Sequence, residues 1–156
     1  MRPIRTCFWF DGVAEEAAKH YTSIFPDSSV DGVLHHGPES DRSGEVLTVS
    51  FTINGQPCTG LNGGPEFTFS EAISLEVPCD TAEEVDRFYD ALVEGGSPQP
   101  CGWLTDRFGV SWQVIPPRLL EYLGSDDAQA RGRVAEVLFA THGKLDTAAL
   151  DAAWRG

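Results

Sequence analysis

The stretch CGWLTDRFGVSWQVIP, residues 101–116, carries the clearest structural signal in this sequence. Asp106 and Gly109 suit positions where the chain reverses, so a tight turn is expected there. Residues 109–116 follow the turn and are nearly all apolar, which predicts a short buried strand. One amide, Gln113, interrupts that strand, and a buried amide costs about 1–3 kcal/mol unless a hydrogen bond satisfies it. Gln113 therefore pairs with a backbone group or water, or it orients a polar ligand.

The rest of the chain predicts the same order of elements twice: a strand, a helix and then further strands. The Asn54–Gly55 pair predicts a hairpin in the first repeat, and Thr81 with Glu84 has capping-box spacing at the start of the second helix. The first repeat comprises a strand at 4–10, a helix at 11–25 and strands at 29–36, 45–53 and 56–64. The second comprises a strand at 71–79, a helix at 80–96 and strands at 98–104 and 109–116. This order indicates an α+β fold.

Residues 117–156 predict a helical C-terminal extension. The segment reads as two or three short helices that are broken near Gly124 and Gly143. We expect this extension to cover either a sheet edge or a partner.

Size and charge exclude several classes of partner. A chain of 156 residues, 41% of them hydrophobic, is long enough for one domain made of two small modules. The formal net charge of −13 argues against nucleic acid and against anionic membrane surfaces. No apolar run is long enough to span a bilayer, and the first ten residues lack the apolar core of a signal peptide. These features predict a cytoplasmic protein.

The residue types that most often bind metals or act as nucleophiles show no functional spacing. No two cysteines form a CxxC pair, so we expect packing roles for Cys7, Cys58, Cys79 and Cys101. No zinc-binding spacing occurs among His20, His35, His36 and His142. The glycine-rich stretches 60–65 and 94–98 match neither a P-loop nor a dinucleotide-binding loop, and turns explain them better.

Three stretches together resemble one protein family: CFWFDGVAEEAAKHYTSIFPDSSV (7–30), LNGGPEFTFSEAISLEVPCDTAEEVDRFYDAL (61–92) and residues 101–116. They are similar to the PhnB-like family, also called 3-demethylubiquinone-9 3-methyltransferase-like, of the vicinal-oxygen-chelate superfamily. Glyoxalase I, bleomycin-resistance proteins and extradiol dioxygenases belong to that superfamily. The tail RVAEVLFATHGKLDTAALDAAW (133–154) also looks like this family.

The resemblance implies paired βαβββ modules that form a curved mixed sheet around a concave cleft, often in a homodimer. The glyoxalase-like domain would span 1–116, with modules 1–64 and 71–116, and the extension would span 117–156. Enzymes of the superfamily hold a divalent metal in the cleft with His, Gln or Glu side chains. Carried over by position, those ligands fall near Thr6, near Asn62, near Ala72 or Ser74, and at Gln113. These side chains bring no negative charge, so they make a poor divalent site.

We therefore expect a cleft that binds a small, partly apolar molecule without a metal or cofactor. The residues expected to line it are Thr6, Phe8, Phe10, Asn62, Ser74, Trp103 and Gln113, and the sequence identifies no catalytic residue. Two alternatives stay open: a metal-dependent lyase, isomerase or dioxygenase of the superfamily type, and a dimeric interaction module that uses the amphipathic tail. S-adenosylmethionine-dependent methyl transfer is not expected, because the glycine-rich loop and element order of a doubly wound sheet are missing.

Overall fold

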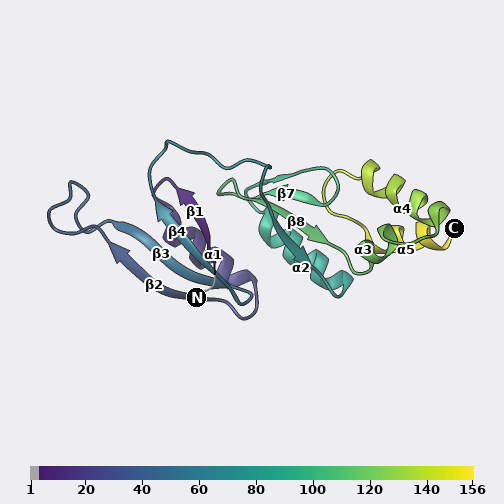
Figure 1. The fold of residues 1–156 in the computed structure, drawn as a ribbon, viewed down its shortest axis with the longest axis horizontal. Helices are drawn as coiled ribbons and strands as arrows, with labels where there is room; N and C mark the ends of the chain where they lie inside the picture. The colour runs from purple at the N-terminus through teal and green to yellow at the C-terminus, as the bar shows by residue number, and fades with distance from the viewer. Residues whose placement is uncertain (1–3) are drawn as a thin grey trace. The chain divides into compact units, whose positions relative to one another are not determined.

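The computed structural model describes residues 4–156, and the chain divides into two compact units at the Phe69–Ser70 junction (Figure 1). We call residues 1–69 unit 1 and residues 70–156 unit 2. Each unit contains one four-stranded sheet with the same order of strands. The predicted α+β class and the repeated βαβββ order are confirmed.

Unit 1 is a mixed sheet covered on one face by a helix. Its elements are β1 (Thr6–Phe10), α1 (Ala14–Ile24), β2 (Ser29–His35), β3 (Val46–Ile53) and β4 (Gln56–Asn62). The sheet order is β1-β4-β3-β2, in which β1 runs parallel to β4 and the other neighbours are antiparallel. The predicted hairpin joins β3 to β4, and Asn54 and Gly55 both have positive φ, 45° and 78°. The turn therefore has the backbone that an Asn-Gly pair favours.

The core of unit 1 is aromatic and lies between α1 and the sheet. The apolar face of α1 is fully or largely buried at Ala14, Ala17, Ala18, Tyr21 and Ile24. The Phe8 ring lies 6.4 Å from the Tyr21 ring and 6.1 Å from the Phe51 ring. Aromatic pairs at such distances add favourable edge and offset contacts to the burial of their area.

Unit 2 repeats this arrangement with shorter strands. Its elements are β5 (Leu75–Pro78), α2 (Ala82–Val93), β6 (Ser97–Pro98), β7 (Trp103–Thr105) and β8 (Ser111–Ile115). The sheet order is β5-β8-β7-β6, and β5 runs parallel to β8. Thr81 caps α2 as its spacing with Glu84 predicted, because the Thr81 hydroxyl accepts from the Glu84 N–H, a donor that the first turn would otherwise leave unpaired. The Glu84 carboxylate accepts from the Asp80 N–H, one residue before the N–H that a complete capping box would use.

The prediction of one strand over 98–104 is wrong. The structure has two short strands here, separated by a turn in which Cys101 and Gly102 have φ values of 62° and 84°. The backbone of this turn pairs with the extension instead: the Cys101 N–H donates to the Thr141 carbonyl, and the Gly102 N–H donates to the Gly143 carbonyl. A distant segment therefore interrupts the strand.

The turn between β7 and β8 is organised by one buried carboxylate. Asp106 is only 3% exposed. It accepts hydrogen bonds from the Phe108 N–H at 2.8 Å, the Val110 N–H at 3.0 Å and the Trp112 indole N–H at 2.8 Å. Gly109 completes the turn with a φ of 88°, a backbone conformation that residues other than glycine rarely adopt. The Asp106 side chain thus holds the turn and the first residues of β8 together.

The C-terminal extension contains α3 (Leu119–Leu123), α4 (Ala128–Ala140) and α5 (Thr147–Arg155). Its apolar cluster includes Ile115 from the end of β8, and the Tyr122 ring stacks on Trp154 at 4.7 Å. Lys144 pairs with Asp86 and Asp90 of α2. The extension therefore packs on its own unit.

Within residues 4–156, no helix is both long and apolar enough to cross a membrane.

We expect Asp106→Ala to lower the free energy of unfolding by about 3 kcal/mol or more, because it removes the buried carboxylate that accepts from the N–H groups of Val110 and Trp112. Asp106→Asn should lie between this variant and the wild type, because the amide keeps one acceptor oxygen. Urea unfolding followed by circular dichroism measures both. An alanine variant within about 1 kcal/mol of the wild type would contradict this role for the carboxylate.

Candidate functional site

The sheet of unit 2 has two chemically different faces. Leu104, Trp112 and Val114 are at most 2% exposed and form the face toward α2, together with Val85 and Leu92 of that helix. Side chains alternate between the faces of a strand, so the residues between these three lie on the opposite face. We call this opposite face of β5, β8 and β7 the open face.

Three side chains form a row across the open face. Gln113 of β8 is the register partner of Glu76 on β5 and of Trp103 on β7. Neighbouring strands lie about 4.8 Å apart, so the row spans about 10 Å from the first backbone to the last. It presents a carboxylate, an amide and an indole in that order.

Gln113 is half-buried and partly committed to its neighbour Ser74. The Gln113 Nε2 group donates to the Ser74 hydroxyl at 2.7 Å. The structure thus brings together Ser74, Trp103 and Gln113, three of the residues that the sequence predicted for a ligand site. The bond leaves the Gln113 Oε1 atom without a partner among the described residues.

Ser111 adds a second polar group to the open face. It lies two residues before Gln113 in β8, and its side chain therefore shares that face. Ser111 is 2% exposed, and its hydroxyl has no hydrogen-bond partner among residues 4–156. At this burial the hydroxyl has almost no surface to offer a ligand, so its missing hydrogen bond is a cost within the fold.

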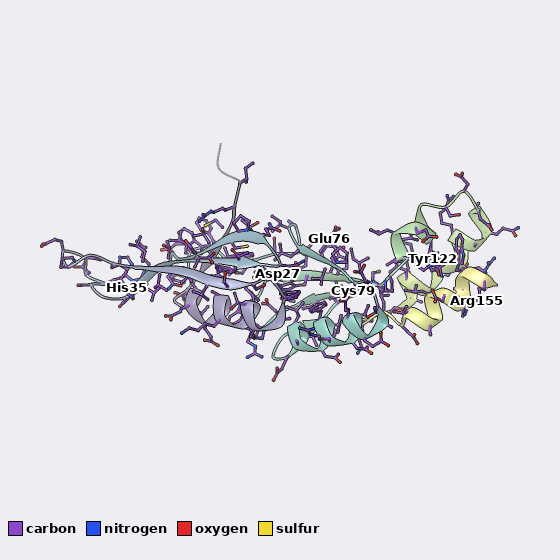
Figure 2. All side chains as sticks on the ribbon, turned by 90° about the horizontal axis from the view of Figure 1, so that it is seen from below. Asp27, His35, Glu76, Cys79, Tyr122 and Arg155 are labelled. Atoms are coloured by element: carbon purple, nitrogen blue, oxygen red, sulfur yellow. The ribbon has the colours of Figure 1, made fainter. Side chains whose placement is uncertain are left out.

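Glu76 was missed by the sequence analysis, which placed the third position at Ala72 or Ser74. Its side chain is exposed and lies on the side of β5 away from α2 (Figure 2). In the sequence, Ser74 and Glu76 alternate with the apolar residues Leu75 and Val77. This alternation indicates that Glu76 shares the polar face of the strand with Ser74. Glu76 supplies a negative charge directly beside Gln113.

The residues predicted from unit 1 are placed differently. Phe8 and Phe10 are 4% and 2% exposed, and both rings contact Phe69 within the aromatic core. Such burial leaves them almost no surface to offer a ligand. The Thr6 hydroxyl accepts a hydrogen bond from Gln56 at 3.1 Å. Their role in ligand binding stays a prediction, and their contacts are those of structural residues.

Asn62 joins three elements of unit 1. It is 3% exposed, its Oδ1 atom accepts from the Ala14 N–H at 2.9 Å, and its Nδ2 group donates to the Val46 carbonyl at 2.9 Å. The side chain therefore satisfies a free donor at the start of α1 and ties β4 to β3. Both ends of the amide are occupied by the backbone.

The four positions implied by the resemblance do not fit a divalent metal. At two of them the polar atoms are engaged by Gln56, Ala14 and Val46, and at the others Ser74 and Gln113 bond to each other. All are neutral, whereas a dication needs charged ligands to offset its desolvation. Within residues 4–156, no three His, Cys, Asp or Glu side chains form a group that could hold a metal.

Two solved structures share the fold of this chain. FosX, the fosfomycin resistance protein from Listeria monocytogenes, is 13% identical, with a TM-score of 0.58 over 80% of this chain and 98% of that chain. A protein from Pseudomonas aeruginosa is 22% identical, with a TM-score of 0.63 over 75% and 98%. These likenesses show the fold alone. Together with the paired βαβββ units, they show that the chain has the glyoxalase-like fold.

The family follows from closer matches. The PhnB protein from Bacillus cereus is 34% identical, with a TM-score of 0.67 over 74% of this chain and 99% of that chain. The family model described as 3-demethylubiquinone-9 3-methyltransferase matches residues 2–115. The chain therefore belongs to this PhnB-like family. The match ends where the helical extension begins, and no curated protein matches the sequence.

We expect Asn62→Ala to lower the free energy of unfolding by about 2 kcal/mol, because the substitution strands the Ala14 N–H and the Val46 carbonyl. Gln113→Ala is the matched control, and its half-buried amide should cost less than about 1 kcal/mol. Urea unfolding curves measure both. Equal losses in the two variants would contradict the division between a structural amide and a site amide.

The cysteines give a prediction that depends on pH. Burial raises the pKa values of the Cys58 and Cys79 thiols to about 11, and for Cys79 the carboxylates of Glu84 and Asp80 add to the rise. At about pH 8, a disulfide reagent should modify exposed Cys7 readily, whereas Cys58 and Cys79 should react only after unfolding. Since the raised pKa values favour the neutral thiols, their contribution to stability is complete below pH 9 and is lost as the pH rises through 11. Fast modification of all three thiols in the folded protein would contradict this burial.

Proposed function

We propose that the protein binds a small, partly apolar molecule on the open face of unit 2, without a metal. The observation that carries the proposal is the row of Glu76, Gln113 and Trp103, joined in register across three strands. The indole offers an apolar surface, and the amide and carboxylate offer hydrogen-bond acceptors. Binding sites commonly combine such an apolar wall with a few convergent polar groups.

The Gln113 amide of the open face supports binding because one of its atoms lacks a partner. Its Oε1 atom accepts no hydrogen bond from the described residues. The bond from Gln113 to Ser74 fixes the direction of the amide, so its free oxygen is already oriented. An oriented acceptor loses little freedom when a ligand binds.

A metal-dependent lyase, isomerase or dioxygenase is the second candidate, and Glu76 is the observation that favours it. This carboxylate beside Gln113 could contribute one charged ligand, and a related fold has been solved with Mn(II): FosX from Listeria, together with a dihydroxypropylphosphonic acid. One carboxylate among neutral groups remains a weak donor set.

Methyl transfer finds no support in the sheet order, which mixes parallel and antiparallel neighbours. A homodimeric state and a cytoplasmic location stay predictions from the sequence.

Thermal unfolding in the presence of small, partly apolar metabolites tests this proposal. A ligand of the open face should raise the Tm by about 3 °C or more at saturation. Gln113→Ala should reduce the rise, whereas Gln129→Ala, which removes an exposed amide from α4, should leave it unchanged. Mn(II) is the parallel arm of the same experiment. A rise that needs Mn(II) and Glu76, with no effect of any organic molecule alone, would favour the second candidate and overturn the first.

A further inference from the structure

We propose that the ligand of the open face is an organic cation, whose ammonium group lies between the Glu76 carboxylate and the Trp103 indole. The proposal rests on the function proposed above and adds the charge of the molecule. It follows from the chemistry of the row and from the Gln113 oxygen, which has no partner among the described residues.

Glu76 provides a charge that the protein itself does not neutralise. Its side chain is exposed, and it takes part in no ion pair among the described residues. The strands β5, β6, β7 and β8 contain no lysine or arginine. Basic side chains of unit 2 lie in α2, at Arg107 of the turn, or within residues 118–155. A cationic ligand would therefore meet an unpaired carboxylate with no competing positive charge in the strands.

Trp103 provides the second surface that favours a cation. The face of an indole ring attracts ammonium groups through its quadrupole, and tryptophan does so best among the aromatic side chains. Trp103 and Glu76 are the two register neighbours of Gln113, about 10 Å apart between backbones. Two inward-leaning side chains at this separation can both contact one ammonium group. An anionic ligand would be repelled by Glu76 and would find no positive partner in the row.

The Gln113 oxygen explains how an N–H of the ligand would be held. The Gln113 Nε2 group is occupied by Ser74, so the amide presents only an acceptor oxygen. The open face thus offers an acceptor and a negative charge, which together complement a protonated amine.

The charge of the whole protein acts in the same direction. A net charge of −13 raises the local concentration of small cations and lowers that of small anions. This effect is general, so it cannot replace the local contacts, and salt screens it. A test must therefore separate Glu76 from the background charge.

Isothermal titration calorimetry with three probes of similar size provides this test: phenethylammonium, phenethyl alcohol and phenylpropionate. The full chain should bind phenethylammonium about tenfold more tightly than phenethyl alcohol, and phenylpropionate most weakly. Glu76→Gln should reduce the preference for the cation to the smaller part that the Trp103 indole supplies. Trp103→Leu should weaken binding of the cation and of the alcohol, because both lie against the ring.

Glu83→Gln is the matched control, because it removes one exposed negative charge from α2 and leaves the row intact. The preference for the cation should survive in this variant. Equal affinities for the cation and the alcohol, or equal losses in the two glutamate variants, would overturn the proposal. If a neutral or anionic metabolite instead binds in a Gln113-dependent way, this inference fails and the proposed function stands. If neither the probes nor the metabolites bind, both fail.

Discussion

The Asp106 carboxylate sets the register on which the open face of unit 2 depends. It fixes the turn through two backbone N–H groups and reaches the indole of Trp112 in the following strand. Trp112 is thereby directed toward α2, and alternation then places Gln113 on the other side of the sheet. A slip of one residue would exchange the two faces and bury the amide in an apolar core. One buried, fully used carboxylate thus determines both the packing of β8 and the chemistry that it exposes.

The two units share one topology but use a side-chain amide differently. The amide of unit 1 has a structural role, whereas the amide of unit 2 keeps one atom available. In unit 1, Asn62 lies at the end of β4, and its Oδ1 and Nδ2 atoms both bond to backbone groups. Neither end of this amide is therefore available to a ligand. In unit 2, Gln113 in the corresponding strand uses one amide atom and keeps its oxygen free. The longer side chain and its place on the open face account for this difference. The extension contributes indirectly, since its backbone holds the 99–102 turn just before Trp103.

Local patterns in the sequence predicted most of the fold because turns, caps and alternation act over a few residues. The Asn54–Gly55 hairpin and the Thr81–Glu84 cap are examples. The strand expected over 98–104 was wrong because residues 141–143, forty positions away, pair with its middle. No local pattern encodes such a partner.

The candidate site was predicted less well, for a similar reason. Phe8 and Phe10 were expected to line the cleft, but the position of α1 shows that their face of β1 is the core. Glu76 could have been found from its alternation with Ser74. The positions of the metal ligands in relatives fall instead at Ala72 or Ser74, and the prediction followed those positions.

The central claim is that the open face of unit 2 binds organic molecules and does not hold a divalent metal. Nuclear magnetic resonance of the side-chain N–H groups tests it directly, because the Gln113 amide and the Trp103 indole each give a distinct signal. Both signals should shift when phenethylammonium is added, while the Trp112 indole, bound to Asp106, stays in place. Stoichiometric Mn(II) should leave the Gln113 and Trp103 signals sharp. Selective broadening of these two signals by Mn(II), with no response to the organic cation, would contradict the account.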